Sequence, residues 1–254
     1  KPETQAICCF CGKLVASLTA KIGIPRAFMD TGRNRFYTNY YSNQASRTTA
    51  NDLKEQAAID ARFFKRELLP FIPSDKGSSI LELGAGYGSM QLFLANQGYT
   101  DARGIDISSE QVARAKELNA EVTEADLDEA LQADVKYDCI IGFDILEHFN
   151  RNEALDMLER IKERLNPGGM IVFRCPNADA PLAGNYTRGD ITHDLFLNRS
   201  SATQLLLAAG FNDPEIHKSY IWTPGLVKNA IRGFLWSIWK IHFKLLLFSS
   251  GRPS

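Results

Sequence analysis

Residues 80–89 read ILELGAGYGS and decide how the rest of the chain is interpreted. An apolar run typical of a buried strand leads into three glycines at alternate positions, Gly84, Gly86 and Gly88. Glycine has no Cβ atom, so the backbone of such a loop can pass close to a ligand. Ligands of doubly wound sheets bind beyond the carboxyl ends of the strands, which makes this loop the first candidate binding site.

Strands and helices alternate on both sides of this loop. We predict strands at residues 79–83, 102–107, 121–124, 137–143, 170–175 and 211–220, and helices at 51–69, 89–97, 109–119, 151–165 and 200–209. The alternation predicts an α/β fold, a doubly wound, mostly parallel sheet of the Rossmann-like kind. We expect three parts: an N-terminal cap of helices and loops at 1–74, the main domain at 75–222 and an amphipathic helical tail at 223–254.

The overall composition excludes several classes of function. A formal net charge of −1 gives no general attraction for nucleic acid, so no nucleic-acid partner is predicted. The N-terminal residues lack the order of a signal peptide, and no uncharged apolar run approaches the length that spans a bilayer. We expect a cytoplasmic enzyme.

The N-terminal sequence CCFCGK resembles half of a zinc knuckle. Cys8 and Cys11 have the Cys-x-x-Cys spacing, and Cys9 is a third thiol. A tetrahedral zinc site needs further ligands, but no second Cys-x-x-Cys exists and the histidines lie far along the chain. We therefore predict a degenerate knuckle in the cap, with zinc binding as the alternative.

The glycine spacing and Glu82 distinguish between the candidate ligands of the glycine loop, whereas Asp106 suits both. A nicotinamide dinucleotide fits the glycines too, so a dehydrogenase remains an alternative. The third glycine, however, comes one residue earlier than in the dinucleotide pattern. Glu82 would repel a pyrophosphate but suits a ligand with an ammonium or sulfonium charge. Asp106 ends the next strand, where it can accept hydrogen bonds from the ribose hydroxyls of either cofactor.

Five motifs in order, ILELGAGYGS, GIDIS, EADL, YDCIIGFDILEHF and LNPGGMIVFRCPN, resemble the class I S-adenosylmethionine-dependent methyltransferases. The similarity covers residues 78–176 closely and extends loosely to 216. It implies methyltransferase activity for the main domain and S-adenosyl-L-methionine as cofactor. The residues that it assigns to the cofactor are Glu82, Gly84, Ala85, Gly86, Gly88, Asp106, Ile107, Asp126, Leu127, Phe143 and Asp144.

In that family the acid that matches Asp126 accepts a hydrogen bond from the adenine amino group. The neighbouring Asp128 is a second candidate for this contact, and Asp126 could instead start a helix. Asp144 is expected near the methionine end, or else as the cap of a turn. Tyr41, in a tyrosine-rich segment, is expected to close over the cofactor as part of a lid, with ordinary loop packing as the alternative.

A hydroxyl acceptor of the methyl group needs a base, and two histidines fall in expected site loops. His193 lies in THD and is predicted to bind the acceptor or to act as base. His148 lies in DILEHF and is predicted to be catalytic, with a structural hydrogen bond as the alternative. No metal site is predicted; a divalent cation on Asp144, Glu147 and His148 is the lesser alternative.

The motif LEH resembles ubiquinone-pathway O-methyltransferases, and the combination of PN, THD and AAGF resembles bacterial methyltransferases of sugars and surface polysaccharides. We therefore expect O-methylation of a sugar hydroxyl in a glycan or a lipid-linked polysaccharide. One alternative is O-methylation of a small aromatic or quinone-like metabolite. An alternative of another class is a non-catalytic, cofactor-binding partner of a glycan assembly complex.

The tail at residues 225–248 is apolar at helical spacing and basic. Five Lys or Arg residues and no acids occur between positions 225 and 254, with Trp236 and Trp239 among them. This composition is typical of a helix that lies in a membrane interface, so we expect peripheral contact with the inner face of the membrane. The alternative is a helix docked on the protein core or on a second subunit. The family's sheet usually ends in an antiparallel hairpin, and only one strand of it, at residues 211–220, can be placed in this sequence.

Overall fold

The structure is a computed structural model that describes residues 5–11, 49–132, 134–219 and 225–251. The chain divides into two compact units, Lys1–Ser219 and Tyr220–Ser254, and each is described by itself. The strands are β1 Gln5–Cys11, β2 Ser79–Leu83, β3 Asp101–Asp106, β4 Val122–Glu124, β5 Tyr137–Phe143, β6 Leu165–Pro176 and β7 Asn212–Lys218. The α-helices are α3 Ala50–Glu67, α4 Ser89–Asn96, α5 Ser109–Glu117, α6 Leu127–Gln132, α7 Arg151–Glu163, α8 Gly184–Thr187, α9 Arg199–Ala208 and α10 Leu226–Ser249. Two short 3-10 helices are η2 Leu69–Phe71 and η3 Leu146–His148.

The first unit is built on one seven-stranded sheet with the order β4-β3-β2-β5-β6-β1-β7. Every pairing between its described strands is parallel. The strand order reverses between β2 and β5, which is the topological switch point where doubly wound sheets bind their ligands. The predicted α/β fold with a doubly wound parallel sheet is confirmed.

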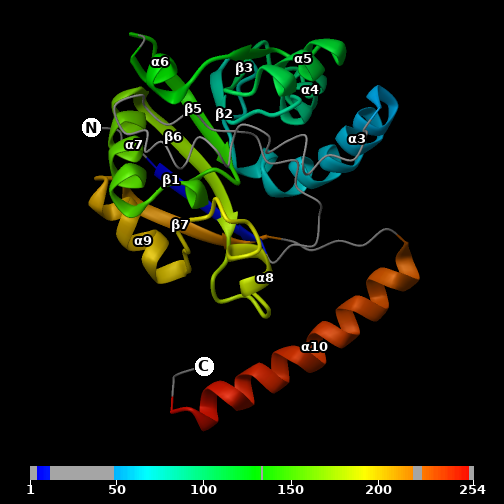
Figure 1. The fold of residues 1–254 in the computed structure, drawn as a ribbon. Helices are drawn as coiled ribbons and strands as arrows, with labels where there is room; N and C mark the ends of the chain where they lie inside the picture. Colours follow the sequence, from blue (N-terminus) through cyan, green and yellow to red (C-terminus); the bar gives the residue numbers. More distant parts are fainter. Residues whose placement is uncertain (1–4, 12–48, 133, 220–224, 252–254) are drawn as a thin grey trace. The chain divides into compact units, whose positions relative to one another are not determined.

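Helices cover both faces of the sheet (Figure 1). Successive strand residues point to opposite faces, so Leu81 and Leu83 pack with α6, α7 and α9, whereas Ile80 packs with α3 and α4. Small residues of α5 and β4 form a third cluster near the glycine loop. The side chain of Glu82 lies on the α3 and α4 face, where it meets Gln91 of α4.

The register of the central strands brings the motif loops to one edge. Leu83 of β2 lies beside Ile105 of β3 and Gly142 of β5. The glycine loop, Asp106 and the loop after β5 therefore emerge side by side at the carboxyl edge of the sheet. This is the crevice in which we expected the binding site.

The N-terminal residues correct one expectation. In place of a knuckle in a separate cap, Gln5–Cys11 is a strand that lies between β6 and β7. The run QAICCF is a short apolar segment, and hydrogen bonding on both sides satisfies its backbone groups. The knuckle was predicted from the spacing of the cysteines, and the apolar run that forms the strand was not considered. The predicted lid residue Tyr41 lies outside the described residues.

The end of the sheet also differs from expectation. The predicted strand at 211–220 is β7, but it pairs in parallel with β1, and no antiparallel pair occurs among the strands that the structure describes. With β1 placed between them, β6 and β7 do not meet as a hairpin.

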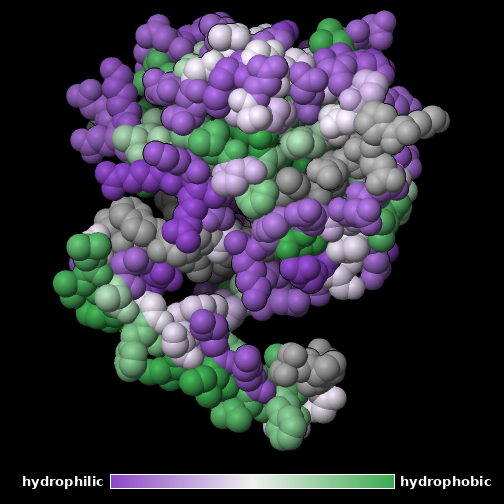
Figure 2. Space-filling model, turned by 180° about the vertical axis from the view of Figure 1, so that it is seen from behind, coloured by the Kyte–Doolittle hydropathy of each residue, from purple (hydrophilic) through white to green (hydrophobic). Residues whose placement is uncertain are grey.

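The tail forms the single helix α10 of 24 residues. No residue along this helix is buried. Figure 2 shows its surface as largely hydrophobic, with hydrophilic side chains along it. Within the described ranges no helix is both long and apolar enough to cross a bilayer.

Candidate active site

The glycine loop connects β2 to α4 in a conformation that glycine favours. Gly84, Gly86 and Gly88 all have positive φ angles, of 70°, 57° and 80°. A Cβ atom at Gly88 would lie 2.4 Å from the Cβ of Ala120, so no larger residue fits without a shift of the backbone. The amide of Ala85, itself buried, donates to the carbonyl of Ile105, which ties the loop to β3.

Asp106, expected to receive the ribose, is buried with 1% of its surface exposed. One carboxylate oxygen accepts a hydrogen bond from Gly86 N and the other accepts one from Ser108 N, both at 2.8 Å. The carboxylate thus holds the glycine loop against the end of β3. The contact of Asp106 with a ribose remains a prediction. The structure shows in addition that Asp106 fixes the conformation of the glycine loop.

Glu82 is buried directly beneath the loop, with 5% of its surface exposed. Gln91 Nε2 of α4 donates a 2.9 Å hydrogen bond to Glu82 Oε2, a contact that sequence reasoning missed. Burial, together with the negative charge of Asp106, raises the pKa of Glu82 to about 8, against the smaller opposing effects of Gln91 and Arg174. A cationic ligand group would relieve this cost by stabilising the ionised carboxylate.

The residues expected to hold the adenine lie after β3 and β4. Leu127 is buried and Ile107 is half-buried. Asp126 Oδ1 accepts a 2.8 Å hydrogen bond from Glu129 N and so starts α6, the alternative named above. Its rival Asp128 forms an ion pair with Arg160 at 2.5 Å. The adenine contact of Asp126 therefore remains a prediction.

Asp144, expected near the methionine end of the cofactor, contacts Arg174, a residue that was not predicted from the sequence. It forms an ion pair and hydrogen bonds with Arg174 of β6, and its backbone takes a positive φ of 55°. The Arg174 guanidinium also lies 4.5 Å from the ring centre of Phe143. The half-buried Phe143 packs against Phe63, so α3 lies against the carboxyl end of β5.

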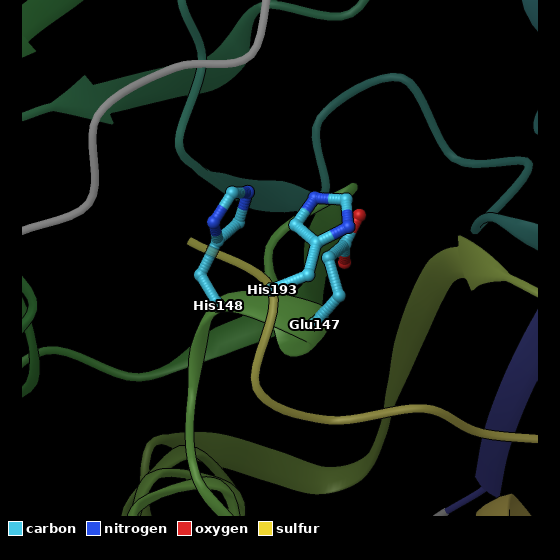
Figure 3. Close-up of side chains that lie close together, drawn as sticks. All are labelled: Glu147, His148 and His193. Carbon is cyan, nitrogen blue, oxygen red and sulfur yellow. The ribbon is translucent and has the colours of Figure 1, made fainter. Parts of the chain in front are cut away.

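Three side chains beyond β5 and β6 converge: Glu147, His148 and His193 (Figure 3). A ligand atom of each lies within 4.8 Å of those of the others. Glu147 and His148 belong to η3 and are each 2% exposed, whereas His193 is half-buried in the loop before α9. The rings of the two histidines stand edge to face with their centres 4.8 Å apart.

Backbone contacts bring the two parts of this cluster together. The amides of Asp194 and Leu195 both donate to the carbonyl of Glu147, at 2.8 and 3.1 Å. The structure thus brings together the two histidines that were predicted to be catalytic. The alternative cation site considered from the sequence combined Glu147 and His148 with Asp144, whereas in the structure their third neighbour is His193.

Each histidine is oriented through its Nδ1 atom. His193 Nδ1 lies 3.0 Å from the carbonyl oxygen of Tyr186, which can only accept, so this nitrogen carries a proton. His148 Nδ1 lies 2.9 Å from the hydroxyl of Thr192, which itself donates to Asp190 at 2.7 Å. His148 Nδ1 therefore donates as well. The positioning residues Thr192, Asp190 and Tyr186 were not predicted from the sequence, although Thr192 is the first residue of THD and Asp190 lies two positions before it.

The chain resembles curated proteins over part of its length. It is 28% identical to a dimethylglycine N-methyltransferase of Parasynechococcus marenigrum (strain WH8102) over 42% of this chain and 40% of that protein. It is 26% identical to phosphoethanolamine N-methyltransferase 3 of Arabidopsis thaliana over 58% of this chain and 31% of that protein. The chain thus spans less than half the length of these curated relatives.

A comparison of folds and a family profile also indicate a methyltransferase domain. A solved S-adenosylmethionine-dependent methyltransferase from Archaeoglobus fulgidus shares the fold with a TM-score of 0.51 and 19% identity, covering 69% of this chain and 75% of that one. A family profile described as "Methyltransferase domain" matches residues 54–216, more than half of the chain. The chain therefore belongs to the methyltransferase-domain family, whose cofactor is S-adenosylmethionine.

Proposed function

We propose that the protein transfers a methyl group from S-adenosylmethionine to a sugar hydroxyl of a glycan, including a lipid-linked one. The observation that carries the proposal is the buried cluster of Glu147, His148 and His193 at the sheet edge that also holds the glycine loop. A cluster that can take up a proton is needed for a hydroxyl acceptor.

The residues present fit the cofactor. The three glycines of the loop place no Cβ atom between its backbone and a ligand, and the buried carboxyl groups of Glu82 and Asp106 favour a ligand that carries positive charge and hydroxyl donors. When bound, S-adenosylmethionine supplies a methyl group already activated on sulfonium. The chain has to align the acceptor oxygen behind that methyl group, exclude water and remove the hydroxyl proton.

His193 is the residue that we assign to the acceptor oxygen. Because its Nδ1 donates to Tyr186, the lone pair of a neutral ring is on Nε2, which can accept the hydroxyl proton as the oxygen forms its new bond. His193 is half-buried in the loop before α9, whereas His148 beside it is almost fully buried, so we assign the acceptor to His193. His148 orients the acceptor or shares the proton.

The tail supports the choice of a lipid-linked acceptor. Seven apolar side chains fall within about 100° of the helix circumference: Val227, Ile231, Phe234, Ile238, Ile241, Leu245 and Phe248. The basic residues Lys228, Arg232, Lys240 and Lys244 fall on the other half. We propose that this helix lies on an anionic membrane surface, where it would concentrate the enzyme near lipid-anchored glycans.

A second candidate function is methylation of a small amine. Both curated relatives named above are N-methyltransferases, which favours it. An aliphatic amine is mostly protonated near neutral pH and would also have to lose a proton, so this candidate could use the histidine cluster as well. O-methylation of an aromatic or quinone-like metabolite would use the same cluster.

The test is transfer of radiolabelled methyl from S-adenosylmethionine into fractions of cell extract. We expect label in lipid-linked or free glycan and its recovery as an O-methyl sugar after acid hydrolysis. The variant His193→Ala should reduce this incorporation at least about tenfold while cofactor affinity stays near that of the wild type. His217→Ala, on the surface of β7, is the matched control. Label confined to small amines would replace the proposal by the second candidate, and cofactor binding without any incorporation would favour the non-catalytic partner.

A further inference from the structure

The cluster of Glu147, His148 and His193 offers one carboxylate and two imidazoles within 4.8 Å of one another. We infer that these three side chains form a binding site for a divalent transition-metal cation of the zinc type. The binding itself depends only on the cluster, whereas the chemistry described for it below rests on the proposed function.

The histidine tautomers suit ligation. Tyr186 and Thr192 fix the proton of each neutral ring on Nδ1, so both rings present the lone pair of Nε2. Metal-binding histidines in proteins almost always donate their other N–H to a carbonyl, a carboxylate or a similar acceptor. His193 uses a backbone carbonyl, and His148 uses a hydroxyl backed by Asp190.

Burial adds an independent observation. His193 Nε2 is inaccessible to solvent and has no hydrogen-bond partner. A buried polar atom without a partner destabilises the folded protein. A cation on this nitrogen would remove that destabilisation, and the nearby Glu147 carboxylate would balance part of the cation's charge.

The donor set selects the kind of cation. Magnesium and calcium prefer sites made of oxygen, whereas imidazole suits zinc, cobalt, iron and nickel. Three protein ligands that include two histidines and one glutamate are the arrangement of several catalytic zinc sites, which keep the fourth position open. Ligands bound at about 2.1 Å in a tetrahedral site lie roughly 3.4 Å apart, so small side-chain rotations are enough to close this cluster.

The open position would receive the acceptor hydroxyl. A bound cation lowers the pKa of a coordinated hydroxyl, so its proton can leave to solvent water near neutral pH. The oxygen lone pair then forms the bond to the methyl carbon, and the carbon–sulfur bond breaks with its electrons retained by sulfur. In this case His193 is a ligand, and the cation replaces it as the group that activates the hydroxyl.

The experiment is a titration of the full chain, free of affinity tag and treated with chelator, with Co²⁺ as the probe. Visible absorption reports the ligands of the cation, and Co²⁺ bound by imidazole and carboxylate is distinguished from Co²⁺ bound by the N-terminal thiols. We expect one such site per chain. His193→Ala should weaken its affinity at least tenfold, and Thr192→Val, which removes the partner of His148 Nδ1, about tenfold. His217→Ala should bind as the wild type does.

Two results would overturn the site: a wild-type protein without the imidazole–carboxylate spectrum, or a folded His193→Ala variant with unchanged affinity. Circular dichroism checks folding, and His193→Gln replaces the alanine variant if that one is unfolded. Failure of the site is distinct from failure of the proposed function. Chelator-treated protein that binds no Co²⁺ but still methylates hydroxyls at the full rate refutes only the metal site. Co²⁺ binding at the cluster without any hydroxyl methylation refutes only the proposed function.

Discussion

Replacing Glu82 by glutamine tests the electrostatics of the pocket. The folded protein holds the Glu82 proton until about pH 8, whereas the unfolded chain releases it near the ordinary value of 4.5. The carboxyl's contribution to stability is therefore complete below pH 4.5 and is lost as the pH rises toward 8. The full difference corresponds to roughly 5 kcal/mol, at about 1.4 kcal/mol per pKa unit. Glu82→Gln stays neutral, so it should lose none of this stability.

We therefore expect Glu82→Gln to gain on the order of 4 kcal/mol relative to the wild type between pH 5 and pH 8.5. Urea unfolding at both pH values measures this difference. Circular dichroism is the suitable probe, because all three tryptophans occur at or beyond position 222, after the last described strand in the sequence. Glu121→Gln, an exposed change, is the matched control. Stability curves for Glu82→Gln and the wild type that run parallel from pH 5 to 8.5 would refute the reasoning.

Cofactor binding gives a second measurement on the same residue. A cationic ligand prefers the ionised carboxylate, so binding below pH 8 must release the Glu82 proton. The affinity of the wild type for S-adenosylmethionine should rise about tenfold per pH unit between pH 6 and 7. Glu82→Gln should bind more weakly and with little dependence on pH. Calorimetry that finds equal slopes for both proteins would contradict the assigned role of Glu82.

Three further predictions concern the loop and the tail. Asp106→Ala should weaken S-adenosylmethionine binding tenfold or more, because it loses a charged acceptor that also orders the loop; unchanged calorimetric affinity would refute the assignment. Gly88→Ala should destabilise the fold by about 2 kcal/mol or more in urea unfolding, because its Cβ meets Ala120, and a neutral effect would show that the loop can move. Deletion of residues 225–254 should abolish co-sedimentation with anionic liposomes; a full-length protein that never sediments would refute the membrane role of α10.

Local patterns were sufficient to predict six of the seven described strands and the glycine loop. Short apolar runs mark β2 and β5, and the three alternate glycines mark the loop after β2, where all of them adopt positive φ angles. Such features depend on neighbouring residues, so they can be read from a single sequence.

Pairings between distant residues could not be predicted in this way. Asp144 meets Arg174, and Glu147 meets His193, only because strand register and loop path bring these segments together. A sequence without an alignment contains neither the register nor the path. The sequence therefore indicated both histidines but not the hydroxyl and carbonyl groups that orient them.

The position of β1 has a consequence for how the protein is made. Its neighbours in the sheet, β6 and β7, begin at Leu165 and Asn212, so a ribosome must add more than 150 residues before the first strand finds a partner. During that interval the segment QAICCF has no neighbouring strand and is open to contacts with other nascent chains. Such long-range pairing makes folding slow, so the yield of protein on expression should respond strongly to chaperones and to synthesis rate.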